Sequence, residues 1–376
     1  MRILIVLLSI LLTVFSHVSF ANPLSLEEKI GQMLIIGFEG KSVTADAPIV
    51  KAIEDLNLGG VILFDYNART KQFDKNIANP QQVKLLNDQL QQITQHANHL
   101  HQREPLPLII AVDYEGGKVN RLKEEYGFPR TMSQKQIGEL PLDNVNIEAN
   151  TMANTLQFSG FNLNFAPVLD VDVNPNNPII GKLERSFSAD PLKVAQDAEI
   201  FSKQYVSHKV QCAYKHFPGH GSSTSDSHLG FVDVTDTWHD EELLPYQQLL
   251  QEKNHCGMIM SAHIVNRKLD ATGLPATLSR VILTDLLRHQ LNFDGVIVTD
   301  DMQMKAIADH YGLAEAVTLS INAGADMLIF GNQLVDIEQD PKEIIHMIKE
   351  KVDSGEISED RINDAYERIC QLKRSI

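Results

Sequence analysis

The segment DGVIVTDD, residues 294–301, carries the pattern that decides the fold: a short run of valine and isoleucine that ends in two aspartates. An apolar run of this length, without polar alternation, is typical of a strand buried on both faces of a parallel sheet. Seven other segments share the pattern, at residues 32–38, 59–64, 107–113, 161–170, 210–217, 257–263 and 325–330. The sequence therefore predicts eight buried strands.

Helix-forming stretches follow most of these strands. They lie at residues 46–56, 80–96, 146–159, 191–207, 241–252, 279–289, 314–322, 341–354 and 358–373. Ser25 and Glu28 form a capping box, and Asp190 with Pro191 forms a second helix start. This alternation predicts the α/β class and a single-domain (β/α)8 TIM-type barrel. A doubly wound sheet is the alternative, disfavoured because no strand is followed by a glycine-rich phosphate turn of GxGxxG spacing.

Composition excludes two classes of partner. The chain has 376 residues, 43% hydrophobic and 22% charged, which is an ordinary globular composition. Its 49 acidic and 33 basic residues give a formal net charge of −16. Nucleic acids and anionic membranes need a cationic surface, so we expect neither as a partner.

The first 21 residues have the pattern of a secretory signal peptide. A basic Arg2 precedes an apolar run over residues 3–15, and Ser19 and Ala21 are the small residues of a cleavage site. The sequence predicts cleavage after Ala21, export to the periplasm or medium, and one catalytic barrel domain over 22–376. An uncleaved membrane anchor is the alternative, disfavoured because spanning a bilayer takes roughly 20 apolar residues.

The three cysteines are isolated in the sequence. Cys212 and Cys256 lie in apolar, strand-like runs, and Cys370 lies in the last predicted helix. No CxxC pair occurs, and three cysteines do not make a disulfide framework. We expect buried thiols that act as small apolar side chains.

Five of the eight predicted strands end in ionisable side chains. These are Asp113, Asp170, the pair Lys215 and His216, His263, and the pair Asp300 and Asp301. One aspartate at a strand end is often only the N-cap of the next helix. Five such strand ends on one rim of a barrel indicate a shared polar ligand, because unpaired polar groups are costly beside an apolar core.

The segment YKHFPGHGSSTSDSHLG, residues 214–230, is the richest in reactive side chains. Pro218 and the glycines predict a long loop. Asp226 and His228 are two residues apart, so the carboxylate can orient the imidazole for acid–base catalysis. Because this loop is rich in glycine and serine, we expect it to swing, and to hold His228 far from Asp300 until substrate binds.

Several of these motifs together resemble the β-N-acetylhexosaminidases of glycoside hydrolase family 3. They are AVDYEGGKVNRL (111–122), FAPVLDVDVNPNNPIIG (165–181), ERSFSADP (184–191), KHFPGHG (215–221) followed by DSH (226–228), MSAHIV (260–265), LPATLSRVILTDLLR (274–288) and GVIVTDDMQMKAI (295–307). The resemblance runs from about Ser25 to past Asn332. It implies a retaining exo-glycosidase that releases terminal non-reducing β-linked N-acetylglucosamine from glycans such as peptidoglycan fragments or chitin oligomers.

The resemblance also implies roles for individual residues. Asp300 corresponds to the nucleophile that forms a glycosyl-enzyme intermediate, and His228 with Asp226 to the acid/base. The residues that match the family's sugar-binding positions are Asp113, Arg121, Arg185, Lys215 and His216. A salt bridge to Glu184 or Asp190 is the alternative role for Arg185. No cofactor and no metal ion is expected.

Four alternatives remain open at this point. A metal-dependent barrel hydrolase would use residues among His216, His220, His228, His263 and Asp300, although the sequence has no HExxH pair. A sugar-binding protein without turnover would leave the Asp226–His228 pair without a purpose. A β-N-acetylglucosaminide phosphorylase would keep the fold and pass the sugar to phosphate. A substrate-assisted mechanism would use the acetamido oxygen as the nucleophile.

Overall fold

The computed structural model describes residues 24–334 and 338–376. The proposed signal peptide, residues 1–21, therefore lies outside the described residues. Within those two ranges, no helix combines the length and the apolar character needed to cross a membrane.

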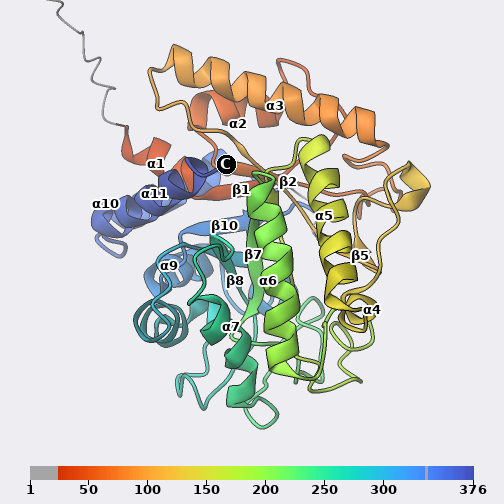
Figure 1. The fold of residues 1–376 in the computed structure, drawn as a ribbon. Helices are drawn as coiled ribbons and strands as arrows, with labels where there is room; N and C mark the ends of the chain where they lie inside the picture. The colour runs from red at the N-terminus through yellow and green to blue at the C-terminus, as the bar shows by residue number, and fades with distance from the viewer. Residues whose placement is uncertain (1–23, 335–337) are drawn as a thin grey trace, which may run out of the picture.

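Eight parallel strands close into a barrel, which confirms the predicted fold (Figure 1). Their order around the barrel is β1, β10, β9, β8, β7, β6, β3 and β2. Their bounds are β1 Leu34–Gly37, β2 Gly60–Leu63, β3 Ile109–Val112, β6 Leu163–Asn164, β7 Gln211–Phe217, β8 Met258–Ser261, β9 Val296–Asp301 and β10 Met327–Phe330. Most strand residues are fully buried, as expected for strands covered by helices outside and filled by side chains inside.

Helices surround the barrel and cover its outer face (Figure 1). The α-helices are α1 Leu26–Gln32, α2 Pro48–Leu56, α3 Pro80–Leu100, α4 Gln134–Gly138, α5 Leu142–Phe158, α6 Pro191–Ser207, α7 Leu244–Leu249, α8 Lys305–Ala308, α9 Leu313–Ala323, α10 Pro341–Asp353 and α11 Glu359–Lys373. The described residues also form three 3-10 helices, η1 Glu124–Tyr126, η2 Asp240–Leu243 and η3 Ala276–Leu278, and η4 Val281–Gln290 is a π-helix. Both predicted helix starts are confirmed: Ser25 and Glu28 cap α1 reciprocally, and Asp190 caps α6.

The structure departs from the predicted elements in three places. The strand predicted over 161–170 is regular only at Leu163–Asn164, and an isolated bridge between Val168 and Lys215 resumes the pairing with β7. The helix predicted over 241–252 divides into η2 and α7, with Pro245 in the first turn of α7. An antiparallel hairpin, β4 Tyr114–Gly116 with β5 Val119–Asn120, follows β3, and the sequence analysis predicted no strands there.

The expectation of free thiols at Cys212 and Cys256 is wrong. The two residues form a disulfide, with their Cα atoms 4.8 Å apart. Cys212 lies near the start of β7, and Cys256 lies two residues before β8, which pairs with β7. Parallel pairing therefore brings together two cysteines that are 44 residues apart in sequence. Cys370 is the free cysteine, and it is buried.

Candidate active site

The predicted site residues come from the carboxyl ends of several barrel strands and from the loops that follow. Asp113 comes directly after β3, Lys215 and His216 lie near the end of β7, and Asp300 lies near the end of β9. In a parallel barrel these ends share one rim. The barrel thus brings residues that are far apart in sequence to one place.

Arg185 and Lys215 both pair with Glu115, a residue to which the sequence assigned no role. The Arg185 guanidinium donates two hydrogen bonds to the Glu115 carboxylate, both at 2.7 Å, and Lys215 Nζ lies 2.7 Å from Glu115 Oε1. Burial alone would raise the pKa of Glu115, but Arg185 and Lys215 outweigh it and lower that pKa well below its usual range. The alternative partners of Arg185, Glu184 and Asp190, are not the ones it uses. Glu115 belongs to the EGG motif, which is the signal that could have found it.

Asp113 lies between two cations at the edge of the same cluster. Its Oδ1 accepts a hydrogen bond from Lys215 Nζ at 3.0 Å, and its Oδ2 lies 3.7 Å from the Arg121 guanidinium. The Asp113 side chain keeps 17% of its surface exposed, whereas Lys215 keeps 3%. Asp113 and Arg121 therefore form the solvent-facing part of a polar wall whose buried part is Lys215 and Glu115.

His216 is held from behind by Asp170. The Asp170 carboxylate accepts a hydrogen bond from His216 Nδ1 at 2.6 Å and another from the His216 backbone N–H at 3.2 Å. With Nδ1 as the donor, His216 Nε2 can accept from Arg185, whose guanidinium lies 3.2 Å away. The sequence placed Asp170 at a strand end without a specific role; in the structure it fixes the orientation of the His216 ring.

Asp300 is a partly buried carboxylate with three imidazoles near enough to act on its charge. Burial would raise its pKa, but the nearby His263, His216 and His228 lower the pKa to about 2. Asp300 Oδ1 also accepts the backbone N–H of Asp301 at 2.8 Å. A carboxylate with this pKa is ionised at every physiological pH, as a nucleophile must be.

The neighbouring Asp301 differs in both protonation and contacts. Burial raises the pKa of Asp301 to about 7, and the charge of Asp300 adds to this effect. Asp301 Oδ1 accepts the backbone N–H of Gln303 at 3.0 Å, and its carbonyl oxygen lies 3.0 Å from His263 Nε2. Asp301 is therefore held between the turn after β9 and His263.

His228 and Asp226 form the predicted pair. Asp226 Oδ1 accepts from His228 Nδ1 at 2.9 Å and from the His228 backbone N–H at 2.8 Å. Burial alone would lower the pKa of His228, but the hydrogen bond to Asp226 and the charge of Asp300 outweigh it and raise that pKa. Because Nδ1 is bonded to Asp226, Nε2 is the nitrogen left to exchange a proton with a ligand.

The loop that carries His228 contacts α8. The Ala306 backbone N–H donates to the Ser227 carbonyl oxygen at 3.3 Å, and the charge of Asp300 acts on His228. The His228 side chain keeps 46% of its surface exposed. The expectation that the loop swings, and that His228 lies far from Asp300 until substrate binds, stays a prediction.

Two histidines of the metal-dependent alternative, His263 and His220, have other protein groups at their ring nitrogens. His263 has a partner at each ring nitrogen, Thr277 Oγ1 at 2.8 Å and the Asp301 carbonyl oxygen at 3.0 Å. Burial lowers the pKa of His220 to about 4, and His220 Nε2 lies 3.4 Å from Ser227 Oγ. Over residues 24–334 and 338–376, no three histidine, cysteine or acidic side chains are grouped as metal ligands.

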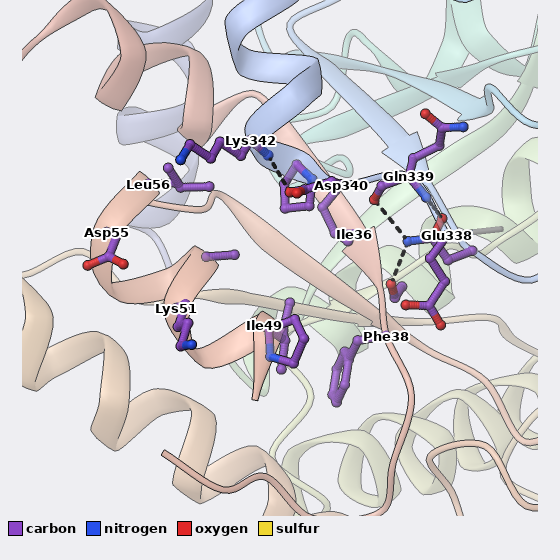
Figure 2. A pocket seen from close by; sticks show the side chains of 15 residues that line it. Ile36, Phe38, Ile49, Lys51, Asp55, Leu56, Glu338, Gln339, Asp340 and Lys342 are labelled. Carbon is purple, nitrogen blue, oxygen red and sulfur yellow. Dashed lines mark hydrogen bonds between the residues drawn. The ribbon is translucent and has the colours of Figure 1, made fainter. Parts of the chain in front are cut away.

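A separate hollow of about 500 Å³ lies outside the barrel, and none of the predicted site residues lines it. Figure 2 shows it between the end of β1, helix α2 and the start of α10, with Phe38 and Ile49 on one side and Asp340 and Lys342 on another. Its lining carries none of the acid, base or imidazole pairs described above.

Comparison with known proteins matches nearly the whole described chain. The model of the glycosyl hydrolase family 3 N-terminal domain covers residues 25–372. Beta-hexosaminidase A of Pseudoalteromonas piscicida is 31% identical over 96% of this chain, but the chain spans only 63% of that relative's length. The beta-hexosaminidase of Thiobacillus denitrificans is 33% identical over 75% of this chain and 74% of its own.

Two solved structures share the fold closely. A glycoside hydrolase family 3 beta-N-acetylglucosaminidase from a Paenibacillus species superimposes with a TM-score of 0.81, at 32% identity over 94% of this chain and 63% of its own. The beta-N-acetylhexosaminidase from Beutenbergia cavernae gives a TM-score of 0.80, at 28% identity over 94% of this chain and 99% of its own.

Proposed function

The chain belongs to glycosyl hydrolase family 3, and from this premise we propose that it is a retaining β-N-acetylhexosaminidase. Its substrates would be glycans that end in non-reducing β-linked N-acetylglucosamine, such as peptidoglycan fragments or chitin oligomers. One observation carries the proposal: Asp226 Oδ1 accepts from His228 Nδ1 at 2.9 Å on the loop that follows β7, at the same rim of the barrel as Asp300 near the end of β9.

In the proposed first step, Asp300 attacks the anomeric carbon and His228 donates its proton to the leaving oxygen. The glycosidic bond breaks and a glycosyl-enzyme ester forms on Asp300. In the second step, His228 takes a proton from water, the water oxygen bonds to the anomeric carbon, and Asp300 leaves. Asp226 stabilises the imidazolium and holds Nδ1, so that Nε2 carries the exchanged proton.

The polar wall would bind the sugar in this scheme. Asp113 accepts from sugar hydroxyls, Arg121, Arg185 and Lys215 offer donors to hydroxyl and acetyl oxygens, and His216 Nε2 offers an acceptor to a hydroxyl. Arg185 and Lys215 are fixed by the buried Glu115, so little side-chain freedom is lost when substrate binds. No metal and no cofactor enters either step.

The experiment that tests this function compares four nitrophenyl glycosides. We expect release from the β-N-acetylglucosaminide, and none from the β-glucoside, the β-galactoside or the α-anomer. Full activity should survive EDTA, and added phosphate should not change the product from free sugar to sugar phosphate. Equal turnover of the β-glucoside would refute the function; a sugar phosphate product would favour the phosphorylase.

We further propose that the protein works outside the cytoplasm, after cleavage of residues 1–21, as one catalytic domain over 22–376. The Cys212–Cys256 disulfide supports this location, because structural disulfides persist in oxidising compartments. Mass determination of the native protein tests the proposal: a chain starting at Asn22 is expected, and an intact N-terminus would contradict it.

A further inference from the structure

Glu242 is a fully buried acid that the proposed mechanism does not use. It lies on η2, the helical turn that precedes α7, and none of its surface is exposed. Its Oε2 accepts the backbone N–H groups of Gly221 at 2.9 Å and of Ser222 at 3.3 Å. Its Oε1 is buried and has no hydrogen-bond partner among the described residues. A buried carboxylate in this position needs an explanation beyond packing.

The two N–H groups belong to the loop that begins at the end of β7. Asp170 holds the same loop from the other side by accepting the His220 N–H at 2.8 Å. Other groups pack closely against the loop backbone at its glycines. A Cβ at Gly221 would lie 1.8 Å from the Val171 carbonyl oxygen, and a Cβ at Gly219 would lie 2.7 Å from Glu242 Cβ. The loop is therefore clamped between two carboxylates.

The contacts of Glu242 and Asp170 with this loop lie between His216 and His228. His216, which contacts Arg185, lies just before the clamped residues. The ring of His220 extends to Ser227 Oγ at 3.4 Å, and Ser227 immediately precedes His228. A displacement at Gly221 would thus reach the sugar-binding imidazole on one side and the acid/base on the other.

We propose that Glu242 is a positioning residue: by accepting the Gly221 and Ser222 N–H groups, it fixes the loop that places His216 and His228 at the sugar. This inference rests on the proposed glycosidase function. Its physical basis is that loss of the acceptor leaves two buried N–H groups unsatisfied, and the loop must move to find other partners. Displacements of about 1 Å in catalytic geometry cost on the order of 10²-fold in rate.

Two substitutions of Glu242 distinguish the effect of its hydrogen-bond acceptor from the effect of its negative charge. Glu242→Gln keeps an oxygen for both N–H groups, whereas Glu242→Leu removes it at similar volume. We expect kcat for N-acetylglucosaminyl disaccharide to fall about tenfold to a hundredfold in the Leu variant, with a smaller change in KM. The Gln variant should keep kcat within about threefold of the original protein. If Glu242→Leu does not fold, Glu242→Asp, whose shorter side chain withdraws the acceptor, should show the same loss.

The ionisation of Glu242 gives a second readout, which tests whether its carboxyl group is buried in the folded protein as the structure has it. Burial raises the pKa of Glu242 to about 7, and the charge of Asp170 adds to this, while Ser222 and the Gly221 N–H oppose it. The other titratable groups that face this region are His220 and Tyr246. A raised carboxyl pKa means that the folded protein loses stability as pH rises from about 4.5 through about 7. The unfolding temperature of Glu242→Gln relative to the original protein should therefore increase between pH 5 and pH 8.

Asp326 provides the matched control. It is a buried carboxylate that accepts the Ile297 N–H at 2.9 Å, but it precedes β10 and so lies at the opposite end of the barrel. Asp326→Asn should lower the unfolding temperature and leave kcat unchanged. If Glu242→Leu or Glu242→Asp behaves like this control, Glu242 is merely structural and the proposal is overturned.

Amide hydrogen exchange of residues 217–228 separates this proposal from the function on which it rests. We expect exchange to be faster than in the original protein for the Leu variant and unchanged for the Gln variant, whatever the substrate is. An original protein that fails to release N-acetylglucosamine would refute the proposed function only. Unchanged exchange in the Leu variant would refute the role of Glu242 even if the enzyme is active.

Discussion

His228 differs from a second carboxyl group in its charge after it has given up its proton. A carboxylic acid becomes an anion, whereas the imidazolium becomes neutral, so an anionic leaving group or acceptor is not repelled by it. The cost is that the imidazolium must be stabilised until it reacts. The 2.9 Å hydrogen bond from Nδ1 to Asp226 and the charge of Asp300 provide this stabilisation.

Replacing His228 tests its role as the acid. We expect His228→Ala to slow cleavage of a disaccharide by about 10²–10⁴-fold and to slow cleavage of a nitrophenyl sugar far less. The reason is that a nitrophenolate leaves with little protonation, whereas a sugar alkoxide needs a full proton. Steady-state kinetics on both substrates measures the difference. As the control, Asp300→Ala should abolish both reactions. Equal loss on both substrates in His228→Ala would show that His228 is not the acid.

Replacing Asp226 tests the pH dependence. A histidine with a raised pKa keeps its proton to higher pH, so acid catalysis is present below that pKa and is lost as pH rises through it. Asp226→Asn removes the stabilising charge and lowers the pKa of His228. The alkaline limb of kcat/KM against pH should therefore move to lower pH. If the alkaline limb of kcat/KM does not move in Asp226→Asn, a group other than His228 determines the pH at which activity is lost.

At the scale of elements, hydrophobic runs predicted the barrel well because a buried parallel strand leaves a local signature. The stretch 294–301 became β9, and 210–217 became β7, within one or two residues. Pairings between distant elements leave no such signature. Arg185 pairs with Glu115, 70 residues away, whereas the only pairing partners considered from the sequence were its near neighbours Glu184 and Asp190. Such contacts depend on which strands become neighbours when the barrel closes.

The Cys212–Cys256 disulfide is another contact of this kind, and it predicts a measurable stabilisation. It closes a segment of 44 residues between β7 and β8. Reduction should lower the free energy of unfolding by about 2–4 kcal/mol through greater freedom of the unfolded chain. Activity at 25 °C should persist, because Cys212 is at the opposite end of β7 from Lys215 and His216.

Urea unfolding with and without dithiothreitol measures this effect. Cys370→Ala is the matched control, because Cys370 is free and buried and its removal leaves the disulfide in place. That variant should keep the full response to the reductant. Identical unfolding curves with and without reductant in the original protein would contradict the prediction.

At the scale of the whole molecule, the candidate site contrasts with the acidic composition of the chain. The chain carries a net charge of −16, yet its polar wall places Arg121, Arg185 and Lys215 against only two carboxylates, Asp113 and Glu115. The wall therefore offers many donors with little net charge, which suits the hydroxyl and acetyl oxygens of a neutral sugar. The closed barrel makes this possible by bringing the ends of β3, β7 and β9 to one rim.

The central claim is that Asp300 attacks the sugar and carries it as an ester. The most direct test treats the protein with a ring-fluorinated N-acetylglucosaminyl donor, which slows the second step, and locates the added mass by peptide mass spectrometry. We predict one sugar per chain, attached to Asp300, and none in Asp300→Ala. An adduct on Asp301, or rapid turnover with no adduct and release of a cyclised acetamido sugar, would contradict the account.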